Sequence, residues 1–342
     1  MRHAVVHFLL AVAHVPLVGS KLLASSGPLL PPSPPPLPPS HAAMPVELSP
    51  WSPLSGELRP LLEPYVHIYL LTFNERIMLP MAVTHYRTQL PNSSITVLDN
   101  DSNDGTSDLA RALGCDVISF SSGSAELAAT HNEFKGREMK NSVWQNVSHG
   151  WIITADVDEW LVVTEAELRR EESIGSSILR VQGFNMVSNS TRTDLADVNL
   201  QHVTVGLGWS WESKPICFLR PAIKTMNFLL GAHSARPQGR IRYSMSIYAN
   251  KHMSWLGVAY LTERLHKGRT RMEPLWNQSW QTWRKTNQHY KSSPELILAQ
   301  HTLLLSHPLL TDLATTVLPA NYTCSTFPTS ETNHGSCVRF HH

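Results

Sequence analysis

The chain has 342 residues, of which 42% are apolar and 16% are charged, and its formal net charge is +1. This composition is typical of a globular protein, and it contains no basic field that would favour nucleic acid as a partner. The four cysteines are too few for a disulfide scaffold and lack the C-x-x-C spacing of zinc or redox sites. One pairing, Cys324 with Cys337, fits a disulfide.

The N-terminus predicts a targeting segment followed by a stalk. An apolar run at residues 4–19 lies between Arg2 and Lys21, which is the pattern of a secretory signal. A membrane-spanning helix needs about 20 apolar residues, more than this run supplies. We therefore expect residues 1–22 to be a signal peptide, with an uncleaved membrane anchor or an organelle presequence as alternatives. Residues 23–62 are rich in proline and predict an extended polyproline stalk, with an SH3-type ligand as the alternative.

N-glycosylation motifs favour a chain that enters the secretory pathway. The sequence contains more N-x-Ser/Thr motifs than its composition predicts. They begin at Asn92, Asn100, Asn146, Asn189, Asn277 and Asn321. We therefore expect the protein in the lumen of the ER or Golgi, either anchored to the membrane or secreted.

From Tyr65 onward, strand-like and helix-like patterns alternate along the chain. Apolar β-type runs predict strands, and runs bounded by capping residues, Gly or Pro predict helices. The strands are expected at 65–71, 94–98, 116–120 and 151–155, and the helices at 74–89, from Thr106 or Ser107 to Gly114, and at 126–147. This alternation predicts an α/β fold with a mostly parallel sheet and helices on both of its faces.

After Val163 the pattern becomes irregular. Two further strands are expected at 177–184 and 214–220, separated by long loops suited to the walls of a substrate site. We expect one domain over 63–295 with an irregular C-terminal region, and then an extension over 296–342 with little periodicity.

Carboxylates gather where two of the predicted strands end. The fourth strand ends in Asp156, Asp158 and Glu159, and a second D-x-D pair, Asp99 and Asp101, follows an earlier strand. A D-x-D pair alone is common, but open α/β sheets bind ligands at these strand ends. Hard oxygen ligands in this arrangement suit a divalent cation that in turn holds phosphate groups.

Three motifs in this order resemble the glycosyltransferase family 2-like group, which has the GT-A fold. They are Thr72–Glu75, the D-N-x-S-x-D-G-T motif over 99–106, and the D-x-D-E motif over 156–159. The resemblance covers about residues 65–165. Farther along, the chain is also similar to family 92-like glycosyltransferases. The segments that carry this similarity are 214–221, 231–233 and 251–252.

The C-terminal half departs from these families at two points. A His-Tyr pair is usual there, whereas Met253 follows His252 in this chain. The acceptor-side E-D pair is not recognisable, so the general base is not identified by the resemblance. A catalytically inactive GT-A-fold protein that binds a sugar or a nucleotide therefore stays open as the alternative function.

The resemblance implies a metal-dependent glycosyltransferase, inverting by family analogy. It would move a sugar from a nucleotide-sugar donor to a glycan, a protein or a lipid acceptor, with Mn²⁺ or Mg²⁺ held by Asp156 and Asp158 against the diphosphate. The donor-binding residues that it implies are Thr72, Asn74, Glu75, Asp99, Asp101, Lys140 and Asn141. From the residues alone, Asp99 and Asp101 could instead build an Asx-type turn, and Glu75 could serve a helix dipole.

The remaining candidate residues come from later in the chain. His252 is the candidate third metal ligand, with His233 as its rival. Glu212 is the candidate base because it stands among tryptophans, where we expect burial to raise its pKa. Glu159 is a second catalytic candidate, with a cap or a salt bridge as its alternative role.

Overall fold

The computed structural model describes residues 63–121, 133–188, 199–209 and 212–264, together with 298, 301, 302, 304–306, 308, 310–313, 317 and 318. All of these residues belong to a compact unit that begins at Glu63. The expected signal, stalk and Cys324–Cys337 disulfide lie outside the described residues. Within the described part of the chain, no helix is long and apolar enough to cross a membrane.

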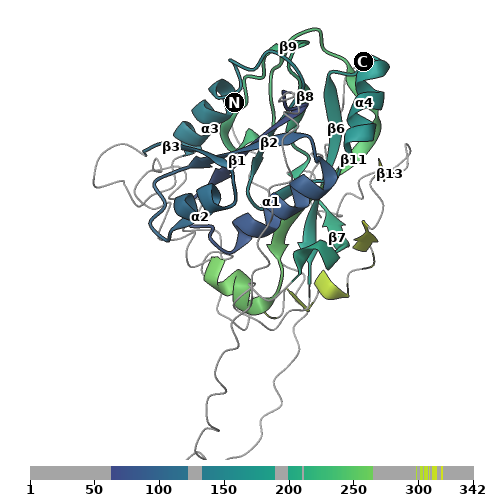
Figure 1. Ribbon diagram of the computed structural model, residues 1–342. Coiled ribbons are helices and arrows are strands. Elements are labelled where there is room, and N and C mark those ends of the chain that lie inside the picture. The colour runs from purple at the N-terminus through teal and green to yellow at the C-terminus, as the bar shows by residue number, and fades with distance from the viewer. Residues whose placement is uncertain are drawn as a thin grey trace, which may run out of the picture. The chain divides into compact units, whose positions relative to one another are not determined.

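Four parallel strands form one half of the main sheet (Figure 1). They are β1 (Val66–Thr72), β2 (Ser93–Asp99), β3 (Asp116–Ser119) and β4 (Trp151–Asp156), in the order β4-β1-β2-β3. The connections contain α1 (Met78–Gln89), α2 (Thr106–Ala112) and α3 (Glu133–Ser142). This half confirms the predicted α/β pattern and is consistent with a GT-A-like fold.

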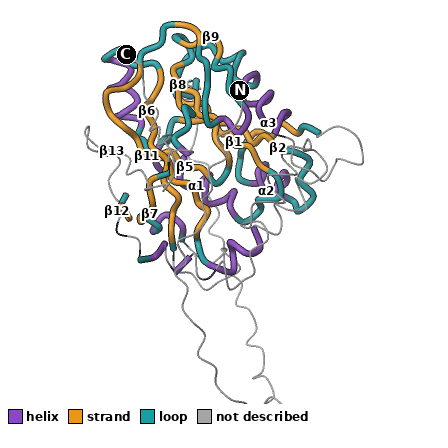
Figure 2. The backbone as a smooth tube through the Cα atoms, turned by 180° about the vertical axis from the view of Figure 1, so that it is seen from behind, coloured by secondary structure: helices purple, strands orange, loops and turns teal. Residues whose placement is uncertain are grey.

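The other half of the sheet is mixed. From β4 outward the order is β8 (Cys217–Leu219), β6 (Ile178–Val187), β7 (Val205–Gly208) and β12 (Leu310–Asp312), each antiparallel to its neighbour (Figure 2). The long strand β11 (Tyr243–Trp255) is parallel to β6 and antiparallel to β5 (Glu159–Leu161) and β13 (Val317–Leu318). Strands β12 and β13 come from the segment expected to be an extension, so part of that segment belongs to the sheet.

Helices pack on both faces of the parallel half. Along β1, Val66, Ile68 and Leu70 face a core that also contains buried residues of α1. The alternate positions Tyr69 and Leu71 face a second core, against which Met139 of α3 and Val143, the residue after this helix, pack. Successive side chains of a strand point to opposite faces, so both apolar sets of β1 are covered.

Two predicted helix starts were wrong. Helix α1 begins at Met78 rather than at residue 74, because Asn74 has a positive φ of 54° and belongs to a turn. Helix α2 begins at Thr106, but its N-cap is Gly105, with φ 87°. The Asp104 carboxylate accepts a hydrogen bond from the Thr106 backbone N–H, so Asp104 provides the capping interaction that was expected from Thr106 or Ser107.

Three other elements differ from the expectation. Helix α3 ends at Ser142, before the predicted Val147, and the predicted start at 126–132 lies outside the described residues. Helix α4 (Glu165–Ser173) and the strand β11 were missed. A short hairpin also follows β8: β9 (Ile223–Thr225) pairs antiparallel with β10 (Gln238–Gly239), and residues 223–239 are called the β9–β10 hairpin below.

Candidate active site

The ends of three neighbouring parallel strands bring the predicted acidic residues to one edge of the sheet. In the strand register, Thr72 at the end of β1 lies beside Asp99 at the end of β2. On the other side of β1, Leu71 lies beside Asp156 at the end of β4. This is the edge at which open α/β sheets bind their ligands.

Asp99 is largely occupied in building the turn after β2. It is 2% exposed, and its Oδ2 accepts hydrogen bonds from Ser107 Oγ at 2.6 Å and from the Ser102 backbone N–H at 3.3 Å. The longer bond from Thr72 Oγ1 to Asp99 Oδ1, at 3.4 Å, joins β1 to β2. The geometry therefore gives Asp99 the Asx-type role that the sequence left open.

Hydrogen bonds from Asn74 and Glu75, two of the residues predicted to bind the sugar donor, connect the loop after β1 to the loop after β2. The Asn74 backbone N–H donates to Ser102 Oγ at 2.8 Å, and the Asn74 side chain accepts from the Asn103 backbone N–H at 2.9 Å. The Glu75 backbone N–H donates to Thr106 Oγ1 at 3.0 Å. Asp101 is different, since its side chain is half-buried and makes no hydrogen bond or ion pair with another described residue.

Asp156 is held by two lysines. Lys140 of α3 reaches it with Nζ 2.7 Å from Oδ1, and Lys214 Nζ lies 3.5 Å from Oδ2. Burial alone would raise the pKa of Asp156, but the two ammonium groups outweigh burial and lower this pKa below its ordinary value. Asp156 is therefore ionised, and its side chain, 33% exposed, is open to solvent at the strand end.

Asp158 is the more deeply buried aspartate of the D-x-D pair, with a side chain that is 8% exposed. Its Oδ2 contacts the Arg264 guanidinium and lies 3.2 Å from His252 Nε2. Burial opposes ionisation, yet Arg264 and His252 hold the pKa of Asp158 well below its usual range. His252 lies on β11, and its Nδ1 is 2.8 Å from Asn185 Oδ1 on the adjacent strand β6.

Glu159 faces inward and supports the D-x-D turn. It is 1% exposed, its Oε1 contacts Lys214 Nζ, and its Oε2 accepts from the Asp156 backbone N–H at 3.2 Å. Burial raises the pKa of Glu159 to about 7, although Lys214 opposes this effect. The salt-bridge alternative for Glu159 therefore describes its position better than contact with a substrate.

Glu212 lies close to His252 and Lys214. Its Oε1 is 3.7 Å from His252 Nδ1 and its Oε2 is 3.6 Å from Lys214 Nζ. The expected rise in its pKa was wrong: burial acts in that direction, but His252 and Lys214 outweigh it and lower the pKa of Glu212. Its Oε2 is buried and makes no hydrogen bond with another described residue.

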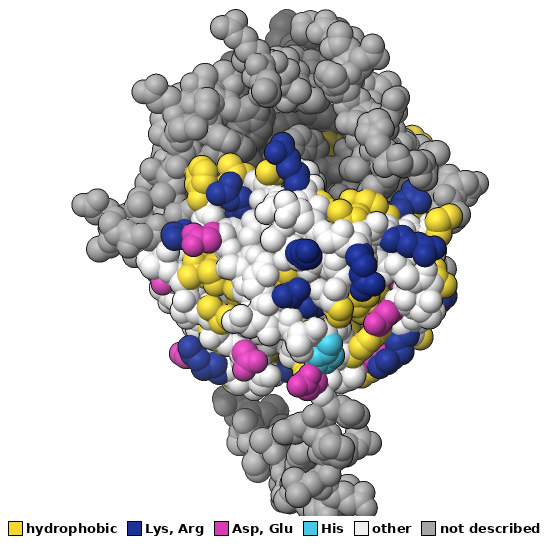
Figure 3. All heavy atoms as spheres, turned by 90° about the horizontal axis from the view of Figure 1, so that it is seen from above, with side chains coloured by type: hydrophobic (Ala, Val, Ile, Leu, Met, Phe, Trp, Pro, Cys, Tyr) yellow, Lys and Arg dark blue, Asp and Glu magenta, His cyan; other side chains and the backbone are white. Residues whose placement is uncertain are grey.

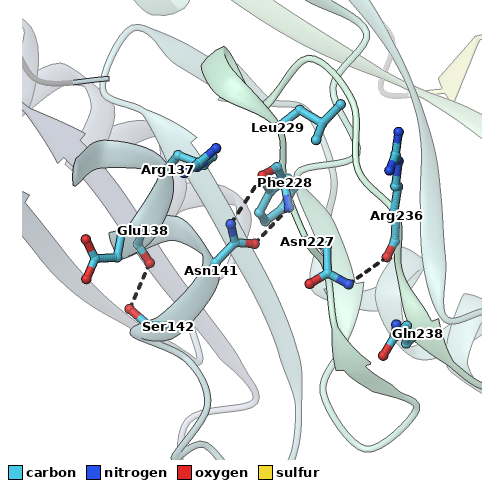
Figure 4. A pocket seen from close by; sticks show the side chains of 9 residues that line it. All are labelled: Arg137, Glu138, Asn141, Ser142, Asn227, Phe228, Leu229, Arg236 and Gln238. Atoms are coloured by element: carbon cyan, nitrogen blue, oxygen red, sulfur yellow. Dashed lines mark hydrogen bonds between the residues drawn. The ribbon is translucent and has the colours of Figure 1, made fainter. Parts of the chain in front are cut away.

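Two of the remaining predicted residues, Asn141 on α3 and His233 on the β9–β10 hairpin, lie away from the D-x-D motif in the sequence. The Asn141 side chain pairs with the backbone of Phe228, accepting from its N–H at 2.8 Å and donating to its C=O at 3.3 Å (Figure 4). Asn141 thus anchors the hairpin to α3 and does not face the strand ends. His233, on the same hairpin, is near enough to Glu212 to help lower its pKa.

Sequence reasoning missed three residues of the site. Lys214 joins Asp156, Glu159 and Glu212, but the sequence indicates it only as part of the segment 214–221 that carries the family similarity. Arg264 carries no local sequence signal, and neither does Asn185. A search for cations able to neutralise the four clustered carboxylates could have proposed Lys214.

One pair of neighbouring ligand atoms in the site could contribute to the binding of a divalent cation. Among the described residues, no three His, Cys, Asp or Glu side chains form a metal-binding group, so the predicted set of Asp156, Asp158 and His252 is not assembled. Asp158 Oδ2 and His252 Nε2, however, are 3.2 Å apart. Two neighbouring ligands on an octahedral cation, with bonds of about 2.1 Å, are roughly 3 Å apart. Phosphate and water oxygens commonly complete such a site.

Three solved structures resemble parts of this chain at low sequence identity. A mannosyltransferase from Pyrobaculum calidifontis, in complex with GDP-Man and Mn²⁺, is 13% identical with a TM-score of 0.24, covering 38% of this chain and 36% of its own. S. aureus TarS 1-349 is 12% identical with a TM-score of 0.29 (45% and 46% covered). Glucosyl-3-phosphoglycerate synthase from Mycobacterium tuberculosis, with UDP and Mn²⁺, is 15% identical with a TM-score of 0.22 (35% and 44% covered).

These likenesses are partial, since the matched part spans less than half the length of each protein. No protein-family model matches the chain, and no curated protein matches its sequence. The comparisons therefore assign the chain to no particular family.

Proposed function

We propose that this protein is a glycosyltransferase that uses a divalent cation and a nucleotide-sugar donor. The observation that carries the proposal is the cluster around the end of β4, where the Asp156 and Asp158 carboxylates lie against four basic side chains. A diphosphate needs positive charge around it, and a cation bound to it needs oxygen and nitrogen ligands. The cluster offers both within one site.

In this proposal, Asp158, His252 and two lysines form the part of the site that binds the donor. Asp158 and His252 would hold the cation, which would neutralise the charge that develops on the departing nucleoside diphosphate. Mn²⁺ suits a mixed carboxylate and imidazole set, and Mg²⁺ is the alternative. Lys140 and Lys214 fix the Asp156 carboxylate and keep it ionised beside the same strand end.

Glu212 is the residue best suited to be the general base. Its lowered pKa keeps it ionised at neutral pH, and its Oε2 is buried without a hydrogen-bond donor among the described residues. An acceptor hydroxyl would supply that missing donor, and Glu212 would take up its proton during transfer. One base is sufficient for a single displacement, which inverts the anomeric centre. The acceptor would be a glycan, a protein or a lipid.

The proposal is tested by thermal unfolding with UDP, GDP and their sugar conjugates, with Mn²⁺, with Mg²⁺, or with EDTA. A ligand at a hundred times its Kd should stabilise the fold by about 2.7 kcal/mol. Asp158→Asn should remove the cation-dependent part of this shift. If no nucleotide stabilises the wild-type protein in the presence of either cation, the transferase proposal is wrong.

Donor hydrolysis distinguishes an enzyme from an inactive binding protein. An active transferase releases free sugar slowly from its donor when water replaces the acceptor, and Glu212→Gln should slow this release by a larger factor than it changes nucleotide affinity. Tight nucleotide binding with no release and no transfer would support the inactive GT-A-fold alternative.

A further inference from the structure

A pocket of about 670 Å³ lies between α3 and the β9–β10 hairpin, apart from the strand-end carboxylates (Figure 4). One wall is the outer face of α3, from Arg137 to Ser142, and the other is formed by hairpin residues that include Asn227 and Arg236. This volume lies within the range of small-ligand pockets and is large enough for a monosaccharide or a disaccharide.

The walls of the pocket are held in place from both sides. The hairpin is closed by the hydrogen bond from the Arg236 N–H to the Met226 carbonyl, at 2.9 Å. The Asn227 side chain donates to the Arg236 carbonyl, also at 2.9 Å. Phe228 is 2% exposed, and its backbone is fixed to Asn141 of α3. The pocket is therefore formed before a ligand arrives, which lowers the entropy lost on binding.

Two guanidinium groups border the pocket from opposite walls. Arg137 projects from α3 and Arg236 from the hairpin segment just before β10 (Figure 4). Among the described residues neither guanidinium has a hydrogen bond or an ion pair, and Arg137 contacts only the ring of Phe134. Glu138, the one carboxylate in the lining, is paired with Lys135 at 2.9 Å. The lining thus offers two planar donor groups suited to a phosphate, a sulfate or a carboxylate.

The surrounding surface is basic as well. Residues 220–242 contain five Lys and Arg and no Asp or Glu, in a chain with 28 basic and 27 acidic residues overall. Lys and Arg side chains gather on the face shown in Figure 3, which is the side at which β9 lies in Figure 1. A local field of this kind draws anionic ligands toward the pocket.

The pocket and the candidate active site share the same two elements. On α3, Lys140 contacts Asp156 while the next residue, Asn141, lines the pocket. On the hairpin, the charge of His233 helps to lower the pKa of Glu212, while Asn227 and Arg236 line the pocket. A ligand in the pocket would therefore contact the two elements that also carry residues of the candidate active site.

We propose that this pocket binds an anionic saccharide, the acceptor of the transfer, and that the guanidinium groups of Arg137 and Arg236 recognise its negative charge. The acceptor role rests on the proposed glycosyltransferase function. The Gln238 amide, which also lines the pocket, would serve the sugar hydroxyls, and the apolar side chain of Leu229, 42% exposed, would serve the C–H face of the ring.

Calorimetric titration of the full chain tests the binding, with EDTA present and no nucleotide. The probes are glucose 6-phosphate, glucose 6-sulfate, glucuronate and neutral glucose, so that the kinds of oxyanion are separated. We expect at least one anionic probe to bind tenfold or more tightly than glucose. Arg137→Gln and Arg236→Gln should each weaken this binding by about ten- to a hundredfold, the loss typical of a charge-assisted hydrogen bond.

Arg240→Gln is the matched control, since Arg240 is an exposed arginine of the same basic segment that does not line the pocket. It should change the affinity by less than about threefold at physiological salt, where distant charges are screened. Equal weakening by Arg240→Gln, or equal binding of glucose and the anionic probes, would overturn the pocket assignment.

A separate titration of UDP and GDP with Mn²⁺ keeps the two proposals apart. The Arg137 and Arg236 variants should bind nucleotide as the wild type does. If nucleotides bind but no anionic saccharide does, the pocket inference fails and the transferase proposal stands. If saccharides bind but nucleotides do not, the acceptor role fails together with the proposed function.

Discussion

At the scale of single residues, the two aspartates of the 99–101 motif have different environments. Asp99 accepts three hydrogen bonds and is buried, whereas Asp101 makes none with the described residues. Asp99→Asn should therefore lower the free energy of unfolding by about 1–2 kcal/mol, because it weakens the acceptor of Ser107 and Ser102. Asp101→Asn, the matched control, keeps a residue type that tolerates its φ of 55° and should change stability by less than about 0.5 kcal/mol.

Urea unfolding of both variants measures this difference, and titration with UDP and GDP measures their affinity. If Asp101 contacts the donor, its variant should lose nucleotide affinity at unchanged stability. Equal destabilisation by the two substitutions would contradict the turn-building role given to Asp99.

A buried histidine predicts how stability depends on pH. His85 is 4% exposed, its ring stacks on Trp160, and its Nε2 is 2.9 Å from the Leu161 carbonyl. Burial lowers the pKa of His85, so the unfolded chain binds the proton first. The stability due to neutral His85 is present above about pH 6.5 and is lost as the pH falls below that value.

Urea unfolding at pH 7.5 and pH 5.5 tests this dependence. The loss of stability between the two pH values should be smaller in His85→Gln than in the wild type. His202→Gln, at an exposed histidine, should keep the loss seen in the wild type. A loss that is unchanged in His85→Gln would remove this histidine from the acid sensitivity of the protein.

At the scale of elements, the capping box of α4 gives a prediction of stability. Thr164 Oγ1 accepts from the Glu167 backbone N–H, and the Glu167 carboxylate accepts from the Thr164 N–H at 2.7 Å. Thr164→Ala should cost about 1 kcal/mol, because a backbone donor at the helix start loses its partner. Ser173→Ala, at the exposed last turn, should cost less than about 0.5 kcal/mol. Comparable urea midpoints for the two variants would show that the box contributes nothing.

Some of the strands and helices could be predicted from the sequence, and others could not. The strands β1, β2 and β4 are short apolar runs followed by turn residues, so their positions and the carboxylates at their ends were predicted. Strand β11 was missed because its Ser, Asn, Lys and His residues interrupt the apolar pattern along 13 residues. Helix α4 carries a readable signal, the T-E-A-E capping box, that was overlooked.

The candidate site was predicted only in part, for a related reason. Asp156, Asp158 and Glu159 stand in one local motif, whereas two of the cations that pair with them come from distant parts of the chain. Lys214 meets Glu159 from 55 residues away, and Arg264 meets Asp158 from 106 residues away. No spacing in the sequence relates these two cations to the carboxylates, so only the folded sheet reveals that they are paired.

At the scale of the whole molecule, the glycosylation motifs can be ranked by exposure. Asn146 is exposed, whereas Asn100 is 0% exposed beside the candidate site. If the chain enters the secretory pathway as proposed, folded protein from a eukaryotic secretion system should carry a glycan at Asn146 and none at Asn100, because a glycan cannot be accommodated in the core. Mass spectrometry of glycopeptides, with Asn146→Gln as the control, decides this. An occupied Asn100 in folded protein would contradict the placement of the β2 turn.

The paired charges at the strand ends have a thermodynamic consequence. Acidic and basic groups are equal in number in the described network, which consists of Asp156, Asp158, Glu159 and Glu212 with Lys140, Lys214, Arg264 and His252. These carboxylates are thus already paired with basic groups of the chain, and a cation or a diphosphate that enters alone leaves a buried charge unbalanced. We expect the two ligands to bind with positive cooperativity: Mn²⁺ should raise the affinity for UDP by the same factor by which UDP raises the affinity for Mn²⁺. A coupling factor near one, measured by calorimetry, would mean that the network rearranges at no cost.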